Sequence, residues 1–151
     1  MIMKKDVERE ELGKYFDKPY YVVDLLPGQA GADRSGRYFA VEKYYLTGTR
    51  YMDLRRRFLG VLLKLNCFHD FIVYPGGDLK PVADPDPGAL MGWIEDGDVL
   101  IRLPEGDALL ALYRNDTHMT LYNPTGALLD MVRTLAASEG LFVWQPSQAQ
   151  A

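Results

Sequence analysis

The sequence is poor in the residues that most often carry metal or nucleophilic chemistry, with one cysteine, Cys67, and two histidines, His69 and His118. A single thiol excludes an internal disulfide framework and a cysteine-rich zinc site. Hydrophobic runs such as Phe58–Leu63 are far too short to span a bilayer. Because 48% of the 151 residues are hydrophobic, the chain is long and apolar enough to bury one core without a metal or a disulfide.

The first residues, Met1–Lys5, lack the apolar segment of a signal peptide, since charged residues follow at once. Together with the lone thiol, this favours a cytoplasmic protein. The end of the chain shows no hydrophobic periodicity. We therefore expect one soluble globular domain over residues 1–145 and a flexible tail at 146–151.

Charge is distributed unevenly along the chain. Residues 1–75 contain 13 basic and 10 acidic side chains, whereas residues 76–151 contain 4 and 11. The net charge of −4 argues against binding to nucleic acid or to an anionic membrane, because both depend on lysine and arginine. The acidic half indicates a basic partner, although acidic residues also collect in loops simply because loops are solvated.

Hydrophobic periodicity predicts three helices, at residues 6–16, 54–65 and 124–138. The middle one is the clearest, because its apolar residues recur on one helical face, which leaves Arg55 outside the stripe. Asn123 has the residue type of an N-cap for the third helix, with Pro124 as its first residue, and Gly140 is a typical residue after a helix end.

Aromatic and β-branched runs predict strands at residues 20–26, 71–74, 99–103, 108–113, 117–122 and 141–144. Residues 38–46 are ambiguous: their composition favours a strand, although Val41 and Tyr45 would share a helical face. Residues 75–92, with prolines at 81, 85 and 87, are expected to form a long loop. The fold class expected is α+β, with a mostly antiparallel sheet of about six to seven strands, three helices and a C-terminal β-β-β-α-β unit.

Two motifs and one further histidine suggest chemistry without completing it. The segment Gly31–Gly36 has the glycine spacing of a phosphate-binding loop, but Arg37 and Tyr38 replace the required lysine and serine or threonine, and a strand rather than a helix is expected to follow. Cys67, His69 and Asp70 are adjacent in sequence, whereas catalytic triads are assembled from distant segments. Neither they nor His118 have the spacing of a metal site, so we expect no catalytic residues, metal or cofactor.

The function favoured by the sequence is a non-enzymatic interaction domain that presents the acidic segment 76–107 to a basic protein or to a second copy of itself. A homodimer would form most simply if the strand at 117–122 lay near a sheet edge. The alternative is a small-molecule-binding protein or enzyme whose pocket uses Cys67, His69 or His118. The candidate binding residues of the interaction domain are four acids and one tryptophan: Asp84, Asp86, Trp93, Asp96 and Asp98.

Overall fold

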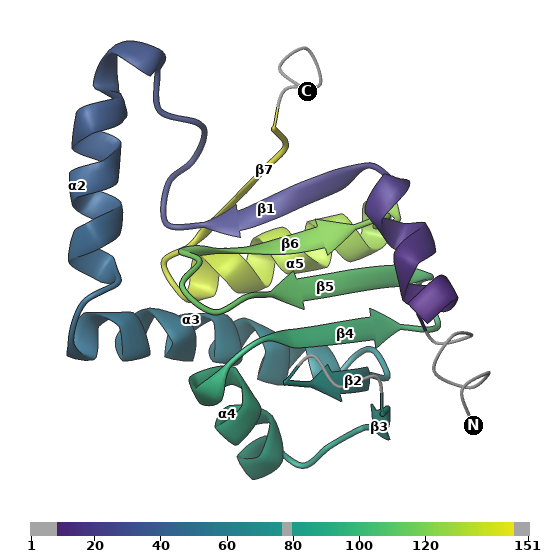
Figure 1. Cartoon of the computed structure of the whole chain (residues 1–151). Helices are drawn as coiled ribbons and strands as arrows, with labels where there is room; N and C mark the ends of the chain where they lie inside the picture. The colour runs from purple at the N-terminus through teal and green to yellow at the C-terminus, as the bar shows by residue number, and fades with distance from the viewer. Residues whose placement is uncertain (1–8, 77–79, 147–151) are drawn as a thin grey trace.

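The computed structural model describes residues 9–76 and 80–146. It contains one seven-stranded sheet in which every neighbouring pair is antiparallel, in the order β3-β2-β4-β5-β6-β1-β7 (Figure 1). The expected α+β class and the C-terminal β-β-β-α-β unit are confirmed. Asp78 and residues 147–151, most of the predicted tail, lie outside the described residues. The strands are β1 (Tyr20–Asp24), β2 (Ile72–Pro75), β3 (Val82–Ala83), β4 (Val99–Leu103), β5 (Ala108–Leu112), β6 (His118–Tyr122) and β7 (Phe142–Trp144).

The structure has more helices than the three predicted. Residues 9–13 are helical and continue into a short 3-10 helix, as expected for the first predicted helix. No described helix is long and apolar enough to cross a membrane. That 3-10 helix is η1 (Lys14–Asp17), and the helical elements after it are η2 (Ala32–Arg34), α2 (Ser35–Tyr45), α3 (Thr49–Asn66), α4 (Pro87–Asp96) and α5 (Gly126–Ser138).

One face of the sheet is covered by α3, α4 and α5 and forms the main core. The apolar stripe predicted on α3 is buried there, including Phe58, Leu62 and Leu65. Strand residues that alternate along β4 and β6, such as Ile101 and Met119, complete this core from the sheet side. The apolar stripe of the helices, with its period of 3.6 residues, thus packs against the alternate residues of the strands in one core layer.

The opposite face is covered only in part. The N-terminal helical segment packs over one end of it, where Leu12 and Tyr15 contact Tyr74 and Leu109 in a second, smaller core. The other end, over β6, β1 and β7, lies beside α2 (Figure 1). The chain therefore leaves a partly open region of sheet between these two covers.

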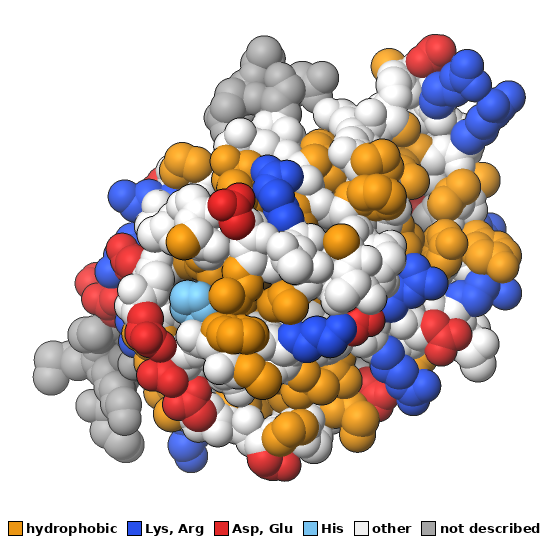
Figure 2. Space-filling view, turned by 180° about the vertical axis from the view of Figure 1, so that it is seen from behind, with side chains coloured by type: hydrophobic (Ala, Val, Ile, Leu, Met, Phe, Trp, Pro, Cys, Tyr) orange, Lys and Arg blue, Asp and Glu red, His pale blue; other side chains and the backbone are white. Residues whose placement is uncertain are grey.

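Residues 38–45 belong to helix α2, and Leu46 is its C-cap, so the strand favoured by their composition is wrong. Strand propensity reflects packing on a half-buried pleated surface, and this segment pairs with no strand. The helix buries none of its residues and leaves Phe39 61% and Tyr44 54% exposed. It projects beside the sheet, with hydrophobic side chains along it and basic side chains at its tip (Figure 2).

The expected loop at 75–92 is also wrong in part, because it contains β3 and the beginning of α4. Pro87 occupies the first turn of α4, where the missing N–H costs nothing. At the third predicted helix, the N-cap is Thr125 rather than Asn123, and its side chain accepts from the Leu128 N–H at 3.2 Å. Asn123 adopts a left-handed backbone with φ 61° and donates its side-chain amide to the Asp107 carbonyl. Gly140, with φ 73°, ends α5 as predicted.

Candidate functional site

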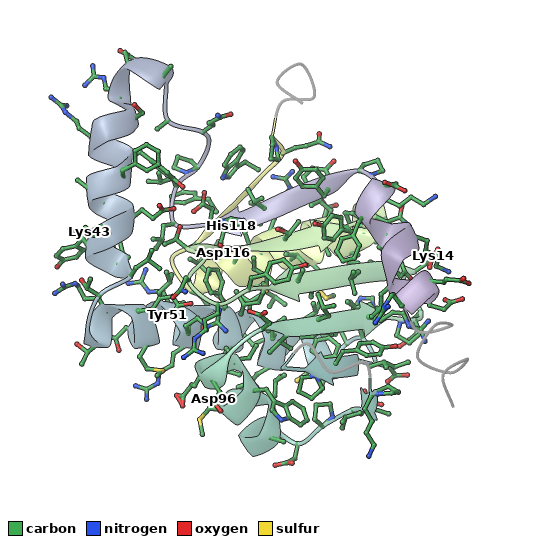
Figure 3. All side chains as sticks on the ribbon, in the orientation of Figure 1. Lys14, Lys43, Tyr51, Asp96, Asp116 and His118 are labelled. Atoms are coloured by element: carbon green, nitrogen blue, oxygen red, sulfur yellow. The ribbon has the colours of Figure 1, made fainter. Side chains whose placement is uncertain are left out.

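The open end of the sheet contains a cleft of about 950 Å³ between β6, β1 and β7 on one side and α2 with the preceding loop on the other. His118 lies at the end of the sheet nearest α2 (Figure 3). The lining of the cleft combines six aromatic rings with a carboxylate, an imidazole and small neutral residues. The lining residues are Phe16, Tyr20, Val22, Asp24, Gly28, Gln29, Ala30, Gly31, Ala32, Ser35, Tyr38, Phe39, His118, Thr120, Tyr122, Trp144 and Pro146.

Strand register explains why these side chains share one surface. Val22 is paired with Thr120 on β6 and with Trp144 on β7, and Asp24 is paired with His118. Directly paired residues of antiparallel strands point to the same face, and residues two apart on one strand do so as well. The floor of the cleft is therefore fixed by backbone hydrogen bonding rather than by a loop.

Asp24 is the one buried carboxylate in the part of the chain that the structure describes, at 8% exposed. Its Oδ2 accepts from the Trp144 indole N–H at 3.1 Å, and its Oδ1 accepts from the Leu25 N–H at 2.7 Å. Burial raises the pKa of this carboxyl, while these two hydrogen bonds, the nearby His118 and the backbone N–H of Leu26 partly oppose the rise. Perturbed carboxyl groups in clefts are frequent at functional sites.

Two further polar groups lie at the α2 side of the cleft. His118 Nε2 is 4.0 Å from the Asp116 carboxylate, so the pair is an ion pair whenever the imidazole is protonated. Tyr38 donates its hydroxyl to Glu42 on the next turn of α2 at 3.2 Å. Burial, followed by the charge of Glu42, raises the pKa of Tyr38 and keeps it a neutral hydrogen-bond donor.

Aromatic rings form the opposite end of the lining. Tyr122 packs edge-to-face with Phe16, with ring centroids 5.2 Å apart, and is tilted against Tyr20 at 5.7 Å. These contacts fix the ring orientations without filling the cleft. An apolar or aromatic ligand body therefore meets a preformed surface.

The structure does not bring together the residues named for the alternative pocket. His118 lines the cleft, whereas Cys67 and His69 follow the C-terminal end of α3 and do not line it. Cys67 is exposed, and its thiol contacts the Leu63 carbonyl at 3.6 Å. Of the three residues, the cleft therefore includes His118 only.

The acidic candidate residues are not gathered into one surface. Asp84 and Asp86 precede α4, and Asp96 and Asp98 lie at its other end, about 15 Å away for a ten-residue helix. Asp98 accepts from the Arg114 N–H at 2.7 Å. Trp93 is partly buried and packs against the main core, so its side chain anchors α4 to that core.

Asp84 has a structural role, so its replacement should lower the stability of the fold. Its Oδ1 accepts from the Phe71 N–H at 2.8 Å, and its own N–H donates to the Phe71 carbonyl at 2.9 Å. We expect Asp84→Ala to lower the free energy of unfolding by about 1–2 kcal/mol, since an N–H loses its acceptor. Urea denaturation measures this, with Asp86→Ala, whose side chain makes no capping bond, as the control. Equal effects of the two changes would contradict the assignment.

The segment that resembles a phosphate-binding loop is followed by a helix, but it lacks the side chains that such a loop uses. Helix α2 begins at Ser35, so the strand expected after Gly36 is wrong. Arg34 and Arg37 do not line the cleft, and Tyr38 holds the position of the metal-binding hydroxyl residue. Among the described residues, no three histidine, cysteine or acidic side chains are grouped so that they could hold a metal ion.

The residues missed by sequence reasoning are Asp24 and the aromatic side chains around it. Asp24 ends a strand of otherwise aromatic and β-branched residues, YYVVD, and a carboxylate at that place was the available signal. Comparisons with protein-family models, with curated proteins and with solved structures find no match for this chain.

Proposed function

We propose that this protein binds a small organic molecule in the cleft between α2 and the β6-β1-β7 end of the sheet. The observation that carries the proposal is the combination of a cleft of about 950 Å³ with a buried carboxylate and six aromatic rings in the lining. Small-molecule sites have this volume and this mixture of apolar walls with few polar groups. The sheet register holds the floor rigid, which lowers the cost of ordering a site on binding.

Interaction of the acidic segment with a basic protein remains a prediction and has less support than the cleft, because α4 separates the four acids into two pairs. Self-association also remains a prediction, but the route through residues 117–122 is wrong, since β6 lies between β5 and β1 rather than at an edge. A cytoplasmic location is part of the proposal, because an exposed free thiol suits a reducing compartment.

A fragment screen observed by NMR tests the cleft. We expect aromatic fragments to shift the amide resonances of β1 and β6. The substitution Thr120→Trp should weaken the binding of these fragments at least tenfold, which is about 1.4 kcal/mol. Thr120 is 7% exposed on the cleft floor, so an indole there occupies the space of the ligand.

The matched control is Thr134→Trp on the exposed face of α5, which adds the same group outside the cleft. Circular dichroism and the melting temperature show whether each variant is folded. Fragments that bind the folded Thr120→Trp variant as tightly as the unmodified protein would reject the cleft as the binding site.

A further inference from the structure

The chemistry of the ligand can be read from the charges around the cleft. Asp24 is buried without an ion pair to any described lysine or arginine. Arg34 and Arg37, in the elements that form its outer wall, do not line it. A buried carboxylate without a basic partner costs stability, and such a cost is commonly retained where a ligand supplies the missing charge.

The carboxylate still has acceptor capacity. A carboxylate offers about four lone-pair sites, and the Trp144 indole and the backbone N–H groups of Leu25 and Leu26 act on it. All three donors are neutral and leave the negative charge uncompensated. A positively charged donor in the cleft would complete the set with a charge-assisted bond.

Two further carboxylates contact residues that line the cleft. Asp116, which precedes β6, lies beside His118, and Glu42 of α2 accepts from the Tyr38 hydroxyl. His118 lies near Asp24 and has Asp116 beside it, with Nε2 4.0 Å from the carboxylate. Neither β7 nor η1 contributes a charged residue to the lining.

The aromatic walls suit the same kind of ligand. The rings near Asp24 are those of Trp144, whose indole donates to it, and Tyr38, whose hydroxyl is close enough to feel its charge, and ring faces attract cations as well as apolar groups. A site with a carboxylate and several ring faces can therefore bind an ammonium group and the apolar body attached to it.

We propose that the ligand of the cleft is an organic cation, in which a protonated amine pairs with Asp24 while an apolar or aromatic body lies against the rings of Tyr38 and Trp144. This inference rests on the proposed small-molecule function. It adds the charge of the ligand and the residue that selects it.

Three probes of similar shape test the charge: 2-phenylethylammonium, neutral 2-phenylethanol and anionic 3-phenylpropionate. We expect the ammonium probe to bind the full chain at least tenfold more tightly than the alcohol, and the carboxylate probe to bind most weakly. Amide chemical-shift titration at millimolar probe concentration measures the three affinities. The preference should shrink with added salt and as the pH falls through the raised pKa of Asp24, where the carboxyl becomes neutral.

The variant Asp24→Asn keeps the shape and removes the charge. We expect it to bind the ammonium probe and the alcohol equally, while Asp130→Asn, on the exposed part of α5, keeps the preference. If Asp24→Asn does not fold, the salt dependence of the unmodified protein decides the question.

Equal binding of the three probes, or no binding of the ammonium probe, would overturn the cation assignment. In that case neutral hits from the fragment screen would keep the small-molecule function. A screen without any hit in the cleft would overturn both proposals.

Discussion

Replacing Arg55 with alanine should lower the free energy of unfolding by about 3–5 kcal/mol, because it removes a buried charge whose partners stay buried. Arg55 is 1% exposed on α3. Its Nε donates to the Ile94 carbonyl at 2.8 Å, its Nη1 to the Tyr113 carbonyl at 2.9 Å, and its Nη2 to the Gly97 carbonyl. Alanine would leave all three acceptors without this donor.

The three carbonyls belong to different parts of the fold. Ile94 and Gly97 lie at the C-terminal end of α4, where carbonyls lack helical partners, and Tyr113 follows β5. One guanidinium therefore joins two helices and the turn after β5. A cation at the C-terminal end of α4 also complements the helix dipole.

Chemical denaturation of two neighbouring variants isolates this role. Arg56→Ala removes the exposed neighbour that pairs with Glu95 at 3.3 Å, and should cost less than about 1 kcal/mol. Arg55→Lys keeps a charge without the planar fork of donors and should fall between the two. Similar stability of the Arg55→Ala and Arg56→Ala variants would show that the three hydrogen bonds carry no weight.

Tyr15→Ala should have the second large effect, a loss of about 3–5 kcal/mol of unfolding free energy. The ring is 1% exposed and joins the N-terminal helical segment to Tyr74 and Leu109 on the sheet. Its hydroxyl donates to Asp107 at 2.7 Å. Loss of the ring would therefore detach the N-terminal helical segment from the sheet. Thermal unfolding and amide hydrogen exchange of β5 would both detect this change.

The hydroxyl adds a dependence on alkaline pH. Burial, together with the hydrogen bond to Asp107 and its charge, raises the pKa of Tyr15 to about 12, from 10.0. Between these values the folded protein holds a proton that the unfolded chain loses, so stability falls as the pH rises through this window.

Tyr15→Phe is the control, because it keeps the ring and removes the titrating group. It should cost about 1 kcal/mol at neutral pH and reduce the alkaline loss of stability. An unchanged alkaline slope in Tyr15→Phe would assign that loss to the other tyrosines with raised pKa values.

The fold was predictable where hydrophobic periodicity is strong. The stripe containing Phe58 and Leu62 identified α3, and the uniformly apolar residues 108–112 identified the buried central strand β5. Periodicity could not place Arg55, because an arginine is buried only when carbonyls from distant segments meet it. It also could not settle α2, whose residues 35–45 are all exposed or half-buried, so that no burial pattern exists to detect.

The candidate site was predictable only in its parts. His118 stood out because histidine is scarce in this chain, whereas Asp24 was one acid among 21. The pairing of Asp24 with His118, and of Val22 with both Thr120 and Trp144, depends on β1 lying between β6 and β7. That order places residues about 100 positions apart side by side, which no local pattern encodes.

The two outermost strands have a consequence for behaviour in concentrated solution. β3 has two residues and β7 has three, so each margin of the sheet presents few unpaired main-chain groups. Stacking of molecules into continuous ribbons needs a longer row of such groups. The same brevity directs any assembly of this protein toward contacts between side chains, and away from fibril growth.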